Sequence, residues 1–268
     1  MKIFSSWGSR SKRILIKILA ILFWLLVWEA VFRYVDREIL IVSPVRTAER
    51  LFELAGTAVF WNAVLGTCRR VLEGFGLAIL TGSVLAVITG RSAFLKHLFE
   101  PFLGVLRATP VASIIILALV WMATGAIPIF VVFLMVTPIV WTNIFAGLEV
   151  IDSGLLEMGK IFKFGKWKRL RYIYFPSLMP YIVSALTSGL GAAWKSAIAA
   201  EVIARPSGAM GAFVHDSRIH LLTADLFAWT TVVIILSVIL EKLMVKLLAF
   251  LGNRLAGKRN KIKRGESA

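Results

Sequence analysis

Long apolar stretches separated by basic segments dominate the pattern of this 268-residue chain. A helix needs about 20 mostly apolar residues to cross the hydrocarbon core of a bilayer. Six stretches reach that length, some only when a short turn separates two neighbours. The predicted spans are residues 14–34, 71–90, 104–124, 127–148, 178–204 and 226–250. The pattern predicts an all-α polytopic membrane protein with about six transmembrane helices, in a single transmembrane domain over residues 1–268.

Segments at the borders of the spans refine this prediction. The first apolar run, which ends in Trp28-Glu29-Ala30-Val31-Phe32, lacks the small-residue cleavage site of a signal peptide, so we expect a retained helix. Gly125-Ala126-Ile127-Pro128 predicts a tight turn between the third and fourth spans. Residues 45–66 are too polar to span, and we expect an amphipathic helix on the external surface of the bilayer.

Composition agrees with a bilayer environment. Hydrophobic residues make up 59% of the chain and the mean hydropathy is +0.83, well above soluble domains. The net charge of +16 does not indicate nucleic-acid binding, because the basic residues lie between apolar spans without a recognition motif. A single cysteine, Cys68, and three scattered histidines suggest no metal site.

The basic residues also predict orientation. With the N-terminus in the cytoplasm, segments 1–17, 91–107, 150–177 and 242–268 face inward and carry 22 of the 31 Lys and Arg residues. This matches the positive-inside rule, and an even number of spans puts both termini in the cytoplasm of a multi-pass cell-membrane protein. We read the basic tail, residues 258–264, as a topology anchor beside anionic lipid.

Small residues recur every four positions in two spans. Helices in lipid associate through close backbone approach, which small side chains permit. The second and fifth spans should therefore lie inside the bundle, either as static packing or as surfaces that move during transport. The close-packing candidates are Gly74, Gly82 and Gly90 in the second span, with Ser188 and Ser196 in the fifth.

Ionisable residues inside a span are costly and are functional candidates. Lys195, beside Trp194, lies midway along the fifth span, and Glu201 follows near its end. Arg70 lies at the start of the second span and could pair with Glu73 three residues later. We predict Arg70, Trp194, Lys195 and Glu201 as candidates for the translocation pathway. Lys195 either meets an anionic substrate or pairs with Glu201 or Glu73.

The loop between the fourth and fifth spans mixes basic and apolar residues. Asp152 or Ser153 can cap a helix, and Glu157 lies in its early turns, where a carboxylate is favourable. A short amphipathic helix should follow and end near Phe164. It either rests on the lipid surface or docks a cytoplasmic partner.

In this loop the chain resembles the permeases of ATP-binding-cassette importers. Their loop motif starts with Glu-Ala-Ala, continues through a glycine and ends in Ile-x-Leu-Pro. The spacing from Glu157 to Pro176 is the same, although other residues replace the alanines, the glycine and the leucine. The motif positions, and hence the residues implied in coupling to an ATPase, are Glu157, Met158, Gly159, Lys163, Ile173 and Pro176.

Other segments narrow the resemblance to the nitrate/sulfonate/taurine type of permease. These are Val42-Ser43-Pro44, residues 67–75, residues 193–202 and residues 225–230. Together they cover residues 40–245 in order.

The resemblance implies a pore of two permease copies, most simply a homodimer. An extracytoplasmic solute-binding protein would deliver the ligand, and residues 153–165 would be the coupling helix that docks a cytoplasmic ATPase dimer. The chain has no Walker A glycine loop, so the partner would bind and hydrolyse ATP, and this chain would be neither an enzyme nor a cofactor protein. Nitrate, bicarbonate, taurine and other sulfonates, or small heterocyclic vitamin precursors, suit that subfamily.

Other classes fit less well. A stand-alone secondary transporter should carry matched ionisable residues in two halves, but Lys195 and Glu201 lie in one span. A membrane enzyme would need clustered His, Asp or Glu at a membrane face, and no such cluster is evident in the sequence. A scaffold or receptor without transport activity stays open.

Overall fold

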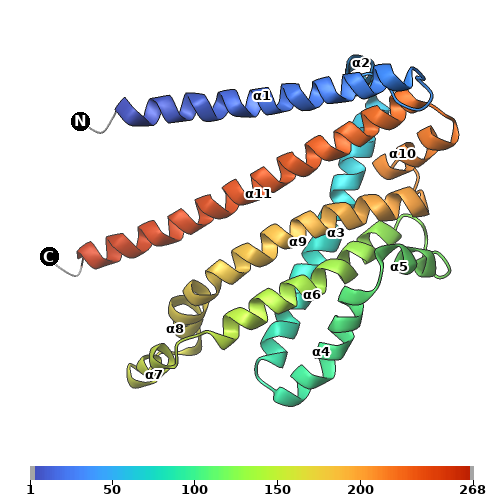
Figure 1. Ribbon diagram of the computed structural model, residues 1–268. Helices are drawn as coiled ribbons and strands as arrows, with labels where there is room; N and C mark the ends of the chain where they lie inside the picture. The colour runs from blue at the N-terminus through green and yellow to red at the C-terminus, as the bar shows by residue number, and fades with distance from the viewer. Residues whose placement is uncertain (1–3, 266–268) are drawn as a thin grey trace. The chain divides into compact units, whose positions relative to one another are not determined.

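The computed structural model describes residues 4–265, with side chains for residues 15–248 (Figure 1). Within this range it contains helices and no strand, which confirms the all-α prediction. The elements are α1 (Phe4–Val35), α2 (Pro44–Ala55), α3 (Ala58–Thr89), α4 (Ala93–Ala108), α5 (Val111–Ala118), α6 (Ile127–Glu149), α7 (Ser153–Ile161), α8 (Lys166–Arg169), the π-helix η1 (Leu170–Tyr174), α9 (Phe175–Ala204), α10 (Met210–Ile219) and α11 (Thr223–Gly265).

The chain divides into two compact units. The first comprises Met1–Trp61 with Phe213–Val232, and the second comprises Asn62–Ala212 with Val233–Ala268. The prediction of a single transmembrane domain stays a prediction.

Four helical segments in the described range are long and apolar enough to cross a membrane. They are Leu15–Val35, Ala58–Thr89, Ile127–Glu149 and Lys166–Ala204, and the bent pair α4–α5 makes a fifth if it forms one span. The count is close to the predicted six. The remaining predicted span, 226–250, lies within the continuous helix α11.

The third predicted span, 104–124, is not one straight helix. α4 and α5 are bent by 97° at the residues between them. Thr109 is extended, with ψ of 128°, because the ring of Pro110 disfavours helical geometry at the preceding residue. The predicted turn follows α5, and α6 begins at Ile127 with Pro128 in its first turn.

The second predicted span begins earlier than its apolar pattern indicated. Residues 45–66 do not form one surface helix. α2 occupies Pro44–Ala55, where the Ser43 hydroxyl accepts a hydrogen bond from the Arg46 amide, and it ends at Gly56. Thr57 accepts a hydrogen bond from the Phe60 amide at the start of α3, which then runs unbroken to Thr89.

The fifth predicted span extends well before Leu178. Helical structure is continuous over residues 166–204, through α8, η1 and α9. Pro176 therefore lies in the first turn of α9 instead of preceding the span. Proline cannot donate to the carbonyl four residues earlier, and the π-helix η1 directly before α9 is the kind of local widening that accommodates this loss.

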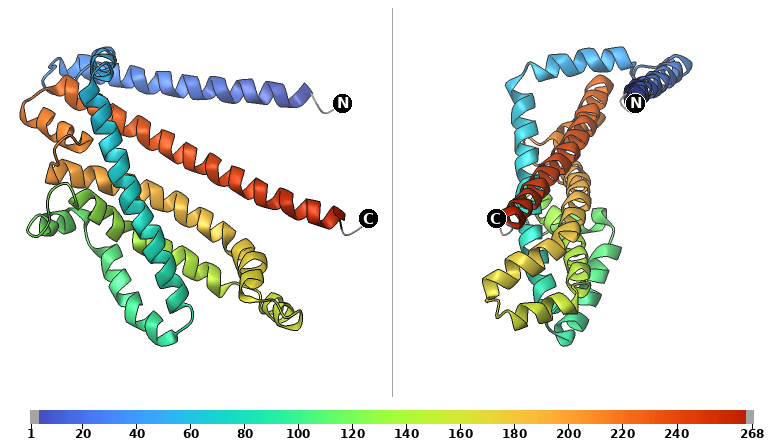
Figure 2. Two further views of the ribbon diagram at one scale, coloured as in Figure 1. Left: turned by 180° about the vertical axis from the view of Figure 1, so that it is seen from behind. Right: turned by 90° about the vertical axis from the view of Figure 1, so that its left-hand side faces the viewer.

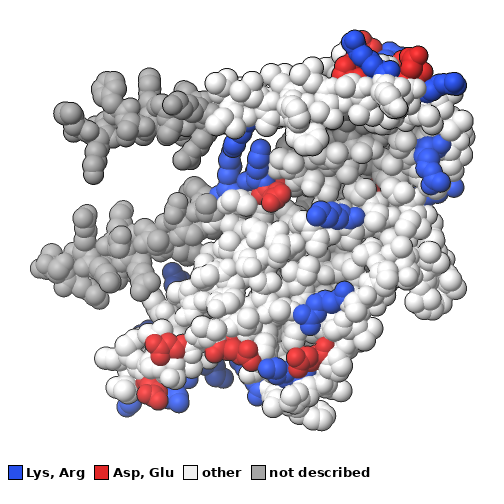
Figure 3. Space-filling model, in the orientation of Figure 1, with Lys and Arg blue, Asp and Glu red and all other residues white. Residues whose placement is uncertain are grey.

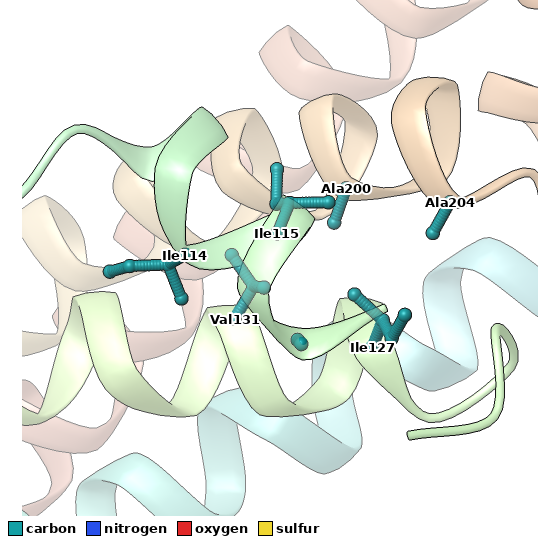
Figure 4. Close-up of a cluster of buried hydrophobic side chains, with 7 residues drawn as sticks. Ile114, Ile115, Ile127, Val131, Ala200 and Ala204 are labelled. Atoms are coloured by element: carbon teal, nitrogen blue, oxygen red, sulfur yellow. The ribbon is translucent and has the colours of Figure 1, made fainter. Parts of the chain in front are cut away.

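The second unit is built around α6 and α9, which lie side by side in both views of Figure 2. α5 packs against both helices, and Figure 4 shows Ile115 of α5 beside Ala200 of α9, with Val131 of α6 below them. The surface over α6 and α9 is mostly uncharged, whereas charged side chains gather at the end that carries α4 and α7 (Figure 3). Such an uncharged exterior suits lipid or other apolar surroundings.

Aromatic packing organises the first unit. The Trp28 indole of α1 donates to the Val42 carbonyl at 2.9 Å and stacks on Phe227. Trp229 lies between Phe213 and Phe60, with ring centroids 4.9 Å and 5.3 Å away. These contacts hold α1, the start of α3 and the first turns of α11 in one cluster.

Two basic segments used to predict orientation have side chains outside the described residues. They are the N-terminal Arg10, Lys12 and Arg13 and the C-terminal tail, residues 258–264. Their role as topology anchors stays a prediction.

Candidate functional site

A buried carboxylate in the second unit joins α3, the end of α9 and the first residues of α10. Glu201, near the end of α9, is fully buried. One carboxylate oxygen accepts a hydrogen bond from Arg70 Nη1 of α3 at 2.9 Å. The other accepts from the Thr67 hydroxyl of α3 at 2.9 Å and from the Gly211 amide of α10 at 3.1 Å. The Thr67 hydroxyl in turn accepts from the Met210 amide at 3.2 Å.

This cluster corrects the expected ion pairs. Arg70 does not pair with Glu73, three residues away, but with Glu201, 131 residues away. Glu73 pairs instead with Arg69 at 2.6 Å, one helical turn earlier. Arg70 pairs with Glu201 and not with the nearer Glu73, because its side chain points from α3 towards the buried end of α9.

The turn between α9 and α10 needs a residue without a side chain. A Cβ atom on Gly211 would lie 2.5 Å from the Glu201 Cβ and 2.7 Å from the Val202 amide nitrogen. α9 ends at Arg205 in the left-handed region, with φ of 53°, and its amide donates to the Glu201 carbonyl. The start of α10 therefore approaches the backbone of α9 closely enough for the carboxylate to cap it.

Lys195 and Trp194 point in different directions. The Trp194 indole is buried and donates to the Val233 carbonyl of α11 at 3.1 Å. Lys195 is exposed, and among the described side chains no hydrogen bond or ion pair engages its ammonium group. Glu201 and Glu73 both have other cations, so the structure does not bring Lys195 together with either expected partner.

The glycines predicted for close packing in α3 face α6. A Cβ atom on Gly74 would lie 2.6 Å from the Ile129 carbonyl oxygen, and one on Gly82 would lie 2.8 Å from the Val140 Cβ. Gly90 is looser, with Leu148 Cδ1 at 3.2 Å. These helices approach each other at distances that a larger residue would not permit.

The buried face of α9 is offset from the predicted serine stripe. Ser196 is buried, but Ser188 is exposed in the single chain. Gly189, next to Ser188, takes the packed position, where an added Cβ would lie 3.2 Å from both Phe75 and Val136. A repeat of four drifts around a helix of 3.6 residues per turn, so one face cannot stay buried along the whole repeat.

The predicted coupling loop folds into α7, α8 and η1. Asp152 is the cap, as one of the two expected candidates, and its carboxylate accepts from the Gly154 amide at 2.7 Å. α7 ends at Ile161, earlier than the predicted 165, and α8 follows from Lys166. The motif positions Gly159 and Ile173 come together: both are buried, and a Cβ on Gly159 would lie 2.8 Å from Ile173 Cδ1.

Lys163 occupies the motif position where related permeases have glycine. Its backbone is in the left-handed region, with φ of 50°. Glycine adopts that geometry without steric cost, whereas other residues pay for it. The turn after α7 therefore keeps a glycine-type conformation even though the glycine is absent.

α7 has an exposed apolar stripe. Leu155, Met158 and Ile161 are spaced three residues apart and are exposed, Ile161 by 77%. Glu157 is exposed as well, and Pro176 lies on the exposed start of α9. A short, polar-flanked helix with an exposed apolar stripe is suited to contact with another macromolecule.

Two residues of the buried cluster were not singled out from the sequence. The sequence pattern predicts no role for Thr67, which lies within residues 67–75, or for Gly211. Their partners lie 134 and 10 residues away, and neither a threonine in an apolar helix nor a glycine after a loop carries a local signal. Among the described residues, no group of three or more His, Cys, Asp or Glu side chains forms a metal site.

The fold and this loop define a class: a polytopic helical membrane protein in which a structured, exposed loop joins two of the spans. Residues 78–255 match the family model described as the binding-protein-dependent transport system inner membrane component. This chain belongs to that family, and it is the membrane permease of an ATP-binding-cassette importer rather than a stand-alone transporter. It is accordingly a multi-pass inner-membrane protein.

Characterised relatives agree with this assignment. The chain is 26% identical over 211 residues to the nitrate import permease protein NrtB of Synechocystis sp., covering 75% of this chain and 76% of NrtB. It is 24% identical over 204 residues to the taurine transport system permease protein TauC of Escherichia coli, covering 74% of each. Both confirm the nitrate/sulfonate/taurine type.

A solved structure supports the fold. The crystal structure of an amino acid ABC transporter with histidines matches with a TM-score of 0.60, covering 76% of this chain and 97% of that one. The sequence identity of 17% is low, so this likeness describes the fold alone.

Proposed function

We propose that two copies of this chain form the translocation pathway of an ATP-driven importer for a small anion. An extracytoplasmic binding protein delivers the solute, and a separate cytoplasmic ATPase dimer drives transport while this chain binds no nucleotide. Permeases for nitrate, taurine and bicarbonate are all similar to this chain, which supports an anion, and a riboflavin permease is similar to the same degree. The feature that nitrate, taurine and bicarbonate share is a negatively charged group that carries oxygen atoms.

The exposed ammonium group of Lys195 is the main observation in favour of an anionic substrate. Lys195 lies inside an apolar segment, residues 166–204, that is long enough to cross the membrane. A lysine so placed is too costly to face lipid and belongs in a water-filled cavity or against another chain. Its own chain supplies no described partner, so its charge is available to a solute anion.

The neighbours of Lys195 on the same face of α9 support a polar pathway. Ser184 and Ser188 are exposed, Gly191 is half-buried, and the space where a Gly191 side chain would lie is open. These positions lie four, three and four residues apart and share one helical face with Lys195. A second copy facing this stripe would enclose a path lined by hydroxyl groups, backbone and an ammonium group.

The loop of α7 and α8 supports docking of an ATPase. The exposed Leu155, Met158 and Ile161 would enter an apolar groove of the partner, and the basic residues of α8 would flank it. The packing of Gly159 on Ile173 ties this surface to the start of α9. Movement of the ATPase would therefore reach the helix that carries Lys195. This arrangement requires both termini in the cytoplasm.

The proposal is tested by purifying the tagged chain with the products of neighbouring genes in mild detergent. We expect two copies of the chain with two copies of a Walker-A ATPase, and ATP-dependent uptake of labelled nitrate, taurine or bicarbonate in vesicles. Lys195→Met should abolish anion uptake, and Lys195→Arg should retain part of it because the charge remains. Purification without an ATPase, or wild-type uptake by Lys195→Met, would refute the corresponding part of the proposal.

A further inference from the structure

The carboxylate of Glu201 has an arrangement that solute binding does not explain. Glu201 and Thr67 are both fully buried, so neither side chain can reach a solute in a water-filled path. Four donors are satisfied within this cluster: Arg70, the Thr67 hydroxyl and the amides of Gly211 and Met210. The sequence predicts Arg70 and Glu201 as pathway residues, whereas this geometry indicates a role in holding helices together.

The first amides of α10 are capped from a distance. The leading amides of a helix have no partner within the helix and need an acceptor elsewhere. Here the acceptors are the Glu201 carboxylate for Gly211 and the Thr67 hydroxyl for Met210. A negative charge at this end of a helix is favourable. The cap thus comes from α9 and α3, and it couples the start of α10 to both.

The ion pair completes the cluster but is a poor source of stability. Arg70 is 17% exposed at its side chain and Glu201 is 0% exposed. A buried pair loses most of its attraction to the cost of removing two charges from water, while breaking it leaves an uncompensated charge. Such a pair does more to define one packing of α3 and α9 than to stabilise the chain.

We propose that Glu201, Thr67 and Arg70 form a positioning latch that holds the turn between α9 and α10 against α3. Transport by an importer requires the bundle to alternate between two discrete packings. The latch defines one of these packings at the end of α9. Turnover depends on it although the buried Glu201 and Thr67 do not contact the solute; this part of the inference rests on the proposed transport function.

Thr67 offers a matched pair of variants. Thr67→Val keeps the shape and removes the hydroxyl, which leaves the Met210 amide without its acceptor and removes one of the three donors to Glu201. Thr67→Ser keeps the hydroxyl. We expect Thr67→Val to speed amide hydrogen exchange at Met210 by about tenfold in the purified complex, and Thr67→Ser to match the wild type. In vesicles, Thr67→Val should lower the maximal uptake rate by about tenfold at an unchanged KM, and Thr67→Ser should restore it.

Reversal of the ion pair distinguishes the latch from a simple salt bridge. A double variant, Arg70→Glu with Glu201→Arg, would restore opposite charges. It should not restore uptake, because an arginine at position 201 cannot accept the hydrogen bond from the Gly211 amide. Glu201→Gln keeps one acceptor oxygen, so its uptake rate should lie between those of the wild type and this double variant.

Each result decides the inference. Wild-type exchange at Met210 in Thr67→Val would overturn the latch, and so would full uptake by the charge-reversed pair. A raised KM at an unchanged maximal rate would overturn it by pointing to solute contact. If Thr67→Val does not fold, exchange at Met210 in Thr67→Ala provides the same test, because alanine also lacks the hydroxyl. Absent uptake by the wild-type complex would reject the transport proposal instead, and the exchange measurement would still decide the latch.

Discussion

Gly159 of α7 lies directly against Ile173 of η1, and a Cβ atom on the glycine would come within 2.8 Å of Ile173 Cδ1. The two residues occupy separate positions of one loop motif and are 14 residues apart. Their contact seats α7 on the helical segment that continues into α9. Ile161, the most exposed residue of the apolar stripe, lies on the opposite side of α7 from Gly159, so the seat and this part of the stripe can be tested separately.

Gly159→Leu should displace α7 from its seat. The larger side chain overpacks a buried contact, which costs about 1–3 kcal/mol, and the exposed stripe then loses its orientation. We expect less ATPase to copurify and uptake to fall. Gly165→Leu is the control in the same loop, since a side chain there meets nothing within 4 Å. Equal copurification in both variants would contradict a seated coupling helix.

Lys163→Gly should leave function intact and raise stability. The backbone φ of 50° costs a lysine about 1 kcal/mol, which glycine avoids, although glycine gives part of the gain back through a more flexible unfolded chain. Lys163→Val should lower stability, because a β-branched residue tolerates this geometry poorly. The melting temperature in detergent measures both. A higher melting temperature for the valine variant would show that the turn is not left-handed.

Gly74→Ala should disrupt the packing of α3 on α6. The added methyl group would meet the Ile129 carbonyl oxygen at 2.6 Å, and backbone cannot move aside as a flexible side chain can. We expect a loss of about 1–3 kcal/mol, seen as a lower melting temperature. Gly76→Ala, two residues along the same helix, has no atom within 4 Å of its Cβ and should be neutral or slightly stabilising. Similar losses at both positions would argue against close approach at Gly74.

The ion pair between Arg50 of α2 and Asp225 of α11 should stabilise the first unit independently of pH near neutrality. Its Nη2–Oδ2 distance is 3.0 Å, and a second hydrogen bond joins Nε to Oδ1. These bonds to Asp225, and then the bond to Glu53, raise the pKa of the Arg50 guanidinium further above its ordinary value. A raised pKa means that stability is lost only as pH rises through that value, far above neutral.

Arg50→Gln should therefore lower the melting temperature by a constant amount from about pH 6 to pH 9, equivalent to about 1 kcal/mol. Arg46→Gln is the matched control on the same helix. Arg46 pairs only with Glu49, and both side chains are about half exposed, so its loss should have little effect. A gap between wild type and Arg50→Gln that widens or closes within this range would contradict the assignment.

Much of the fold was predictable because a bilayer imposes a length and an apolarity on any span. The fourth predicted span, 127–148, matches α6 to within one residue, since an uninterrupted apolar run has few alternative structures. The predicted spans differ from the helices at two prolines and at the polar beginnings of α3 and of the segment that leads into α9. Pro110 breaks the third predicted span into two helices, whereas Pro176 lies within a continuous helical segment. The residue type is the same in both places, and only the surroundings decide between a break and a π-helix.

The loop motif shows a similar division. Its spacing pointed to Gly159 and Ile173, and the structure brings them into contact, although no substitution has yet tested their role in coupling. Lys163 could not be interpreted from its identity, because a lysine gives no sign of a left-handed backbone. The roles of Glu157, Met158 and Lys195 likewise remain predictions until their variants are measured.

The amino-acid sequence alone was sufficient to identify a helical membrane permease of the importer type. Hydropathy, basic loops and motif spacing are local properties that do not depend on how the helices pack. Which charged side chains form ion pairs depends on the packing of the helices. Arg70 had Glu73 one turn away and Glu201 131 residues away, and it pairs with Glu201 because α3 and α9 pack closely enough to bury that carboxylate. A buried charge requires a partner, and which residue supplies it depends on how the helices pack rather than on their order in the chain.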